Sequence, residues 1–217
     1  MKFFADTANI EEIKQIKKWG LLDGVTTNPT IISRENRPFK EVVTEILQTV
    51  DGPVNLEVIS TDAEGMVREA LKLASLASNV VVKIPMTTEG IIAVKELSAR
   101  GVKTNITLTF SPTQALIAAK AGGSYVSPFI GRWDDISSEG MQVVEDILTI
   151  FNNYGYKTEI IVASVRHPIH ILQAARLGAH IVTAPLKVIE QLFHHPLTDI
   201  GLKRFLEDWK KVPNPEF

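Results

Sequence analysis

The chain has 217 residues, 45% of them hydrophobic, which is enough to bury one substantial core without requiring a second domain. It contains no cysteine, which excludes disulfides, thiolate nucleophiles and cysteine-based metal sites, and its net charge of -2 gives no general attraction to nucleic acid or to an anionic membrane. The first residues lack the apolar core of a signal peptide and charged or polar residues interrupt every apolar run, so we expect a cytoplasmic protein with no nucleic-acid or membrane partner.

Strand-like and helix-like segments alternate along the whole chain. Short β-branched or apolar runs bounded by turn residues predict strands, and apolar residues spaced three or four apart predict helices. The predicted strands are residues 3–6, 24–28, 54–59, 80–84, 104–110, 125–130, 160–165 and 181–185. The predicted helices are residues 9–19, 39–47, a helix opened at Thr61, 89–97, a helix opened at Ser111, 137–154, 168–177 and 198–210.

Two helix starts carry specific signals. Thr61 with Glu64 three residues later matches a capping box, and Ser111 with Gln114 matches a second one that also has Pro112 in its first turn. At the other end of the chain, we expect the proline-containing tail from Val212 to be loose.

Eight strands, each followed by a helix, predict an α/β fold: a minimal (β/α)8 TIM barrel formed by residues 1–217 as one domain. A doubly wound open sheet is the alternative, but no Gly-x-Gly-x-x-Gly follows the first strand. The last predicted helix is amphipathic, with Leu202, Phe205, Leu206 and Trp209 along one stripe.

The run from Val80 to Thr87 contains the most unusual placement in the chain, because Lys83 lies near the end of a strand that is otherwise apolar. An ammonium group is costly there, and a poorly solvated lysine loses its proton more readily and can then attack a carbonyl to form a Schiff base. The alternative is that Lys83 extends from the strand end to water.

Side-chain alternation tests these two interpretations. In a barrel every second strand residue faces the axis, so Lys83 would share the inner face with Val81. In the next strand Ile106, Leu108 and Phe110 would face the helices. The inward set would then contain Asn105, Thr107 and Thr109, Asp6 with Phe4, Asn28 with Thr26, Glu57 with Asn55, Ser127 with Phe129, and Ser164 with Val162. Burying so many polar groups together would be destabilising without a function, which favours catalysis at Lys83.

Two arginines and the histidines complete the candidate residues. Arg132 and Arg166 follow the sixth and seventh strands, where barrels often bind phosphate, although each alone could be a solvated surface arginine. His167 and His170, like the pair at 194 and 195, lack an acidic partner at metal-ligand spacing, so we expect structural or surface roles and no metal site.

Five segments together resemble the transaldolases, and the resemblance extends over nearly the whole chain. It is closest to the small group that also contains the fructose 6-phosphate aldolases. The segments are Phe4-Ala5-Asp6-Thr7-Ala8, Gly24-Val25-Thr26-Thr27-Asn28-Pro29-Thr30, Val82-Lys83-Ile84-Pro85, Thr104-Asn105-Ile106-Thr107-Leu108-Thr109-Phe110-Ser111 and Ser127-Pro128-Phe129-Ile130-Gly131-Arg132.

The resemblance implies a barrel enzyme with a class I Schiff-base mechanism that needs no cofactor and no metal. It implies that a dihydroxyacetone unit passes from sedoheptulose 7-phosphate to glyceraldehyde 3-phosphate, giving erythrose 4-phosphate and fructose 6-phosphate in the non-oxidative pentose phosphate pathway. The implied roles are a Schiff base at Lys83, proton transfer at Asp6, water activation by Glu57 with Thr107, dihydroxyacetone binding by Asn28, Asn105 and Ser127, and phosphate binding by Arg132, Arg166 and Ser164. The group also implies a homo-oligomer, a pentamer or a decamer.

Two positions bear on the choice within the group. The resemblance implies that the aldolases carry Gln and Tyr where this chain has Glu57 and Phe129, and that the tyrosine helps to protonate the enamine and release dihydroxyacetone. A phenylalanine cannot donate that proton, so the sequence favours a transaldolase over a fructose 6-phosphate aldolase. A non-catalytic barrel that binds sugar phosphates is the alternative from another class.

Overall fold

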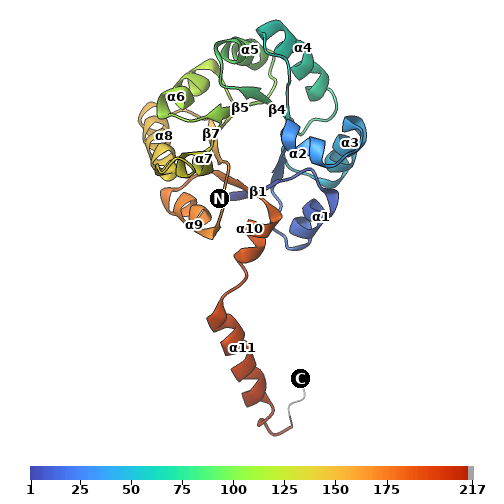
Figure 1. Ribbon diagram of the computed structural model, residues 1–217, viewed down its shortest axis with the longest axis vertical. Coiled ribbons are helices and arrows are strands. Elements are labelled where there is room, and N and C mark those ends of the chain that lie inside the picture. The colour runs from blue at the N-terminus through green and yellow to red at the C-terminus, as the bar shows by residue number, and fades with distance from the viewer. Residues whose placement is uncertain (215–217) are drawn as a thin grey trace.

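The structure, a computed structural model, describes residues 1–214. Within these residues eight parallel strands form a closed barrel in chain order, which confirms the predicted (β/α)8 fold and excludes the open sheet. Figure 1 looks along the barrel and shows the helices in a ring around it. The strands are β1 (Lys2–Asp6), β2 (Gly24–Thr26), β3 (Val54–Glu57), β4 (Val80–Pro85), β5 (Thr104–Thr109), β6 (Tyr125–Pro128), β7 (Glu159–Val162) and β8 (Ile181–Ala184).

The described residues form eleven helices, three of which were not predicted. The predicted ones are α1 (Ile10–Lys18), α3 (Phe39–Thr49), α4 (Ala63–Ala74), α5 (Thr88–Ala99), α6 (Pro112–Ala121), α8 (Gly140–Tyr154), α9 (Pro168–Leu177) and α11 (Pro196–Trp209). The additional helices are α2 (Pro29–Arg34), α7 (Ile130–Asp134) and α10 (Leu186–Gln191), each only five or six residues long. Fewer than two turns give no recognisable apolar period, which explains why these helices were missed.

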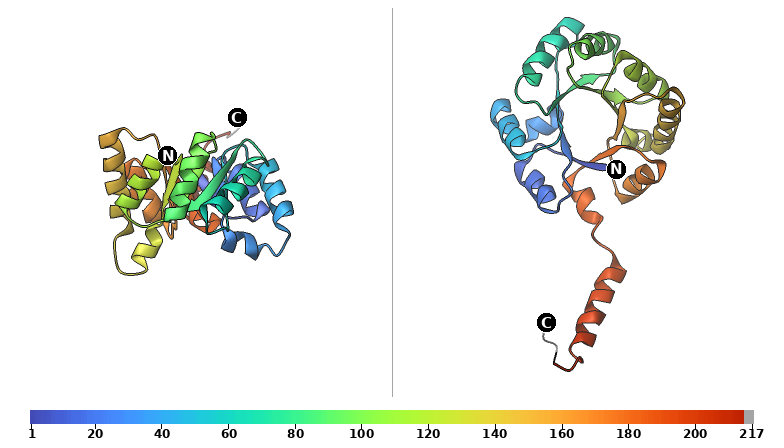
Figure 2. Two further views of the ribbon diagram at one scale, coloured as in Figure 1. Left: turned by 90° about the horizontal axis from the view of Figure 1, so that it is seen from above. Right: turned by 180° about the vertical axis from the view of Figure 1, so that it is seen from behind.

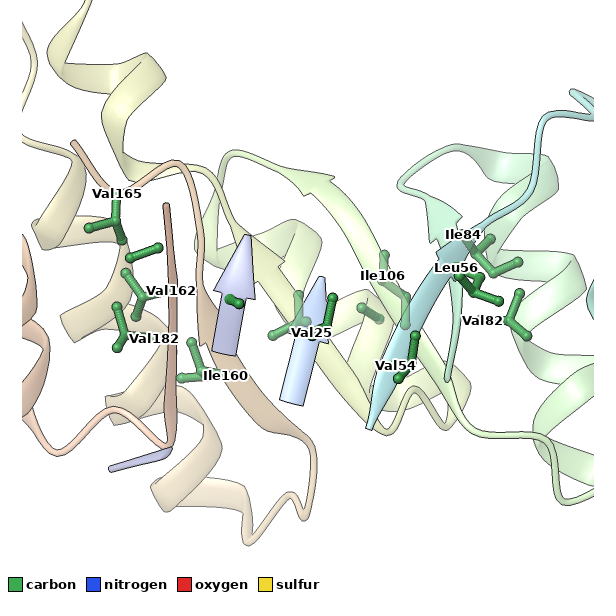
Figure 3. Packing of buried hydrophobic residues seen from close by; sticks show 14 of the residues in the cluster. Val25, Val54, Leu56, Val82, Ile84, Ile106, Ile160, Val162, Val165 and Val182 are labelled. Atoms are coloured by element: carbon green, nitrogen blue, oxygen red, sulfur yellow. The ribbon is translucent and has the colours of Figure 1, made fainter. Parts of the chain in front are cut away.

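The main core lies between the barrel and its helices. Figure 3 shows part of this layer, with branched side chains such as Val25, Leu56 and Ile84 projecting from the strands. A second, smaller cluster consists of Phe4, Val81, Tyr125, Ile161 and Ile181, which are contributed by five different strands. Because alternate residues of a barrel strand face opposite sides, this second cluster fills the barrel interior beneath the polar residues.

Two expectations about alternation were wrong. Val162 belongs to the outer core and Ile161 to the inner cluster, so Ser164 does not reach the cavity by sharing a face with Val162. Strand β7 ends at Val162, and Ser164 has a φ of 62°, so it is the turn beyond the strand that exposes Ser164 to the cavity. Leu108 also has a positive φ, 56°, beside a register shift in β5, and it is 36% exposed instead of packed against helices. The left-handed conformation costs a residue with a side chain about 1–2 kcal/mol.

Helix caps were predicted with mixed success. The capping box of Ser111 and Gln114 is confirmed in both directions. The box predicted at Thr61 is wrong, because Asp62 caps α4 by accepting a hydrogen bond from the backbone N–H of Gly65 at 2.7 Å. A carboxylate one residue closer to the helix serves the same orphan N–H groups.

The last helix, α11, projects away from the barrel in Figure 1 and in the right-hand view of Figure 2. None of its residues is buried. The predicted loose tail from Val212 lies partly outside the described residues, and residues 212–214 belong to no helix or strand. Over residues 1–214, no helix combines the length and the apolar character needed to cross a membrane.

Candidate active site

A cavity of about 530 Å³ opens at the carboxyl ends of the strands. Parallel barrels place their sites at this end because all eight βα loops meet there. Eight of the predicted site residues line it: Asp6, Asn28, Lys83, Ser127, Phe129, Arg132, Ser164 and Arg166. The other three are not among the lining residues; Asn105 and Thr107 are fully buried, and Glu57 is in contact with Lys83.

Lys83 is 4% exposed and is not an isolated amine. Its Nζ lies 3.1 Å from Oε2 of Glu57 and donates a hydrogen bond of 2.9 Å to the backbone carbonyl of Thr27. Burial removes water from the ammonium, and these two oxygen atoms replace part of that solvation. Attack on a carbonyl requires the free amine, so the ammonium must first lose a proton. The Glu57 carboxylate, 3.1 Å away, can accept it.

The carboxyl group of Asp6 has a raised pKa. Burial is the main cause, and it outweighs the opposing effects of the Thr26 hydroxyl, the Lys83 ammonium and the Arg34 guanidinium. The Thr26 hydroxyl donates to Oδ1 of Asp6 at 2.8 Å, and it lies 2.5 Å from the Thr183 hydroxyl. A carboxyl group tuned in this way can accept a proton in one step and return it in another.

A line of hydrogen bonds joins four strands, β6, β5, β3 and β2. The Ser127 hydroxyl donates to Oδ1 of Asn105 at 2.9 Å, and Nδ2 of Asn105 donates to Oδ1 of Asn55 at 2.9 Å. Nδ2 of Asn55 in turn donates to the carbonyl of Val25 at 3.0 Å. These bonds orient Ser127 at the cavity surface, since each buried amide in the line is satisfied by its neighbour.

Asn28 and Phe129 occupy places that the strand pattern did not predict. Asn28 lies beyond β2 and caps α2, accepting a hydrogen bond of 2.8 Å from the N–H of Ile31 through its Oδ1. Its Nδ2 group remains available to the cavity. Phe129 lies between β6 and α7. Its ring packs against the Phe110 ring in a tilted arrangement, with centroids 5.9 Å apart, and the guanidinium carbon of Arg132 lies over it, 5.0 Å from the ring centre.

Arg132 and Arg166 come from adjacent loops that pack closely. A β-carbon at Gly131 would lie 2.2 Å from the carbonyl oxygen of Ser164 and 2.6 Å from Nε of Arg166, so only glycine allows this approach. Arg166 also forms an ion pair of 2.9 Å with Asp135. Arg132, Ser164 and Arg166 therefore come from loops in close contact and line the same cavity, an arrangement suited to a phosphate.

The structure adds a third cavity arginine that sequence reasoning missed. Arg34 ends α2 and lines the cavity, and its charge acts on Asp6. Arg34 could not be placed because α2 itself was not predicted. Its only sequence signal was a position six residues after Asn28 in the first long βα loop.

Within residues 1–214 no group of three or more His, Asp or Glu side chains comes together in a way that could hold a metal ion. The residues that line the cavity include an amine, three carboxyl groups and three guanidinium groups, which suits proton transfer and anion binding.

Comparison with known proteins gives one consistent result. The model of the transaldolase/fructose-6-phosphate aldolase family matches residues 3–215. A probable transaldolase of Aquifex aeolicus (strain VF5) is 68% identical, and one of Hydrogenobaculum sp. (strain Y04AAS1) is 65% identical, each over 217 residues and the full length of both chains. A probable transaldolase of Thermoanaerobacter sp. (strain X514) is 62% identical over 212 residues, or 98% of each chain.

Proposed function

The chain belongs to the transaldolase/fructose-6-phosphate aldolase family, and we propose that it is a transaldolase. It transfers a dihydroxyacetone unit from sedoheptulose 7-phosphate to glyceraldehyde 3-phosphate, which gives erythrose 4-phosphate and fructose 6-phosphate. The observation that carries this proposal is the buried Lys83 paired with Glu57 at the base of a polar cavity rimmed by arginines. We also propose that residues 1–217 act as one catalytic domain; a cytoplasmic location stays a prediction.

Lys83 begins the reaction by losing a proton to Glu57. The free amine attacks the ketose carbonyl to form a carbinolamine, which loses water to become a protonated imine. The Thr107 hydroxyl is buried and has no hydrogen-bond partner among the protein groups of residues 1–214. Thr107 lies two residues beyond Asn105, the register partner of Lys83, so with Glu57 it can hold the water that these steps release and consume.

Asp6 then acts on the bond that breaks. Its carboxylate takes the proton from the hydroxyl on C4, the C3–C4 bond breaks, and the electron pair moves into the imine to form an enamine while the aldehyde leaves. In the second half, the enamine carbon attacks the acceptor aldehyde and Asp6 returns the proton to the new hydroxyl. Hydrolysis of the imine frees the product and restores Lys83.

The phosphate of donor and acceptor binds at Arg132, Arg166 and Ser164. Their convergence beside Gly131 supports this assignment. The Asn28 amide and the Ser127 hydroxyl, which Asn105 orients, bind the hydroxyls of the dihydroxyacetone unit. Phosphate binding at the rim and imine formation at the base hold the sugar in an extended pose across the cavity.

Substitution of Phe129 tests whether the protein transfers the dihydroxyacetone unit to an acceptor or releases it as free dihydroxyacetone. The wild-type protein is expected to release free dihydroxyacetone from fructose 6-phosphate slowly, and to turn over quickly once erythrose 4-phosphate is added. Phe129→Tyr introduces a hydroxyl that can protonate the enamine, so we expect acceptor-independent release to rise about 10²-fold or more, the scale of one positioned proton donor. Free dihydroxyacetone is measured with a coupled reductase.

Phe110→Tyr is the matched control, because that ring packs against Phe129 yet does not line the cavity. It should leave release unchanged. Efficient release by the wild-type protein without an acceptor would contradict the transaldolase proposal and favour fructose 6-phosphate aldolase.

We propose that the chain forms a homo-oligomer, a pentamer or a decamer, in which the projecting helix α11 packs against a neighbouring copy. Along α11, Leu197, Ile200, Leu202, Phe205 and Leu206 are between 57% and 72% exposed. A helix that offers so much apolar surface away from its own barrel needs a second surface to cover it. A neighbouring copy of the chain supplies one in a ring.

Phe205→Glu combined with Leu206→Glu is expected to reduce the particle mass from that of the assembly to that of one chain, because two carboxylates would be buried at the contact. Light scattering after size exclusion measures the mass. Lys203→Glu, a charge change on the same helix, should leave the mass unaltered. If the wild-type protein already has the mass of one chain, the oligomer proposal is wrong.

A further inference from the structure

His170 links the two segments that carry the rim arginines. It lies in the first turn of α9 and is 4% exposed. Its Nδ1 accepts a hydrogen bond of 3.2 Å from the backbone N–H of Arg166, and its Nε2 lies 2.8 Å from Oδ2 of Asp134. Because a nitrogen that accepts from an N–H carries no proton, the ring hydrogen is assigned to Nε2, where it is donated to Asp134.

Asp134 extends this link to Arg132. It is the last residue of α7, the five-residue helix that carries Arg132, and its other oxygen, Oδ1, accepts a hydrogen bond of 3.0 Å from the N–H of Gly140 at the start of α8. The imidazole therefore joins the backbone of one rim arginine to the end of the helix that carries the other. The tight approach at Gly131 leaves little room for the two segments to shift independently.

We propose that His170 is a positioning residue for the substrate phosphate, which fixes the spacing of Arg132 and Arg166 through its two hydrogen bonds. The proposal rests on the proposed function, in which these arginines bind the phosphate. Guanidinium groups bind phosphate through directional forks, so a small loss of alignment weakens binding although the charges remain. His170 itself does not line the cavity.

The charges around His170 favour the neutral ring that this bridge requires. Burial lowers the pKa of His170, and the neighbouring His167 and Arg166 lower it further, whereas Asp134 opposes them. The His167 ring lies 3.8 Å from the His170 ring, centre to centre. Protonation would place a hydrogen on Nδ1 against the N–H of Arg166 and would break the bridge at that end.

The test compares two acceptors that differ only by the phosphate, glyceraldehyde 3-phosphate and glyceraldehyde, with saturating sedoheptulose 7-phosphate. In a two-step transfer the acceptor kcat/KM is independent of donor binding, so the ratio of the two values reports recognition of the acceptor phosphate. His170→Gln and Asp134→Ala are each expected to lower this ratio about tenfold, the scale of one or two lost hydrogen bonds, while kcat/KM for glyceraldehyde stays within twofold of wild type.

His170→Asn supplies a conservative rescue. Its amide oxygen takes the place of Nδ1 and can accept from Arg166, so its loss should be smaller than that of His170→Leu, which keeps neither hydrogen bond. Glu139→Ala is the matched control, since Glu139 lies close to Asp134 in sequence and makes no side-chain cap hydrogen bond. It should leave the ratio unchanged. As the pH falls toward the lowered pKa of His170, the ratio of the wild-type protein should fall more steeply than that of His170→Asn. His170→Asn binds the same substrate phosphate, whose own titration therefore affects both proteins, but it lacks the titrating ring.

An unchanged ratio in both His170→Gln and Asp134→Ala, or an equal loss for both acceptors, would overturn the proposal. If His170→Gln does not fold, Asp134→Ala decides the test. The Asp134 side chain is 36% exposed, so its removal disturbs the core less. If the wild-type protein transfers nothing, the proposed function fails, and binding of inorganic phosphate by calorimetry tests His170 instead. Weakening of phosphate binding by His170→Gln and its loss in Arg166→Ala would support the positioning role; equal binding by wild type and His170→Gln would contradict it.

Discussion

Replacing Lys83 by methionine is expected to abolish the transfer reaction, with a loss in kcat on the order of 10⁴-fold or more, the scale seen when an enzyme loses its covalent nucleophile. Methionine keeps most of the buried volume but has no amine to attack the ketose carbonyl. The measurement is turnover with fructose 6-phosphate and erythrose 4-phosphate. In parallel, borohydride reduction during incubation with fructose 6-phosphate should add mass to Lys83 in the wild-type protein and none to the variant.

Stability must be separated from chemistry in this experiment, because Lys83→Met leaves Glu57 without its ion-pair partner at 3.1 Å. Removing one member of a buried pair typically costs about 3–5 kcal/mol of unfolding free energy. The double variant Lys83→Met/Glu57→Gln removes the unpaired charge, so it should recover stability in urea unfolding and stay inactive. If the wild-type protein gains no mass after borohydride, the enzyme proposal is wrong and a non-catalytic sugar-phosphate-binding barrel becomes the better description.

Asp6→Asn is expected to lower kcat by about 10²- to 10⁴-fold, the typical contribution of a general acid–base group. The amide keeps the shape and can still accept from Thr26, but it cannot take the proton from the donor hydroxyl. Steady-state transfer measures the loss. Glu12→Gln is the matched control, since this carboxylate lines the same cavity from α1 and has no part in the mechanism; it should change kcat by less than threefold.

Asp6→Asn should not lose stability at neutral pH. The pKa of Asp6 is raised by burial, so the group contributes stability that is fully present below its ordinary value of 3.8 and is lost as the pH rises through the raised folded value. Above that folded value the buried charge opposes folding, and asparagine removes the cost. Urea unfolding at pH 8 should therefore show Asp6→Asn at least as stable as wild type, with a smaller difference at acidic pH. A marked destabilisation at pH 8 would show that the ionised carboxylate supports the fold.

The predictions that were confirmed rest on residues close together in the chain, although the equally local capping box at Thr61 and the helix-facing placement of Leu108 were wrong. The cap at Ser111 and Gln114 was confirmed because both partners lie within one helical turn. The parity that placed Lys83 with Val81 was confirmed in the same way, since alternation within one strand needs no knowledge of the rest. Short helices were not predicted. The helix α2, which has Arg34 at its end, has only six residues and shows no apolar period in the sequence.

The sequence by itself determined the barrel, its eight strands and the inward placement of Lys83, because backbone alternation and apolar periodicity are properties of neighbouring residues. Only the tertiary structure decided which groups meet. The pairing of Glu57 with Lys83 joins residues 26 positions apart, and the bridge through His170 joins Asp134 to Arg166, 32 positions apart. Side-chain alternation also could not predict the placement of Ser164, because β7 ends at Val162 and the positive φ of Ser164 redirects the chain. Contacts of this kind depend on how the strands close and how their loops leave the barrel, and that geometry is set by packing of the whole fold.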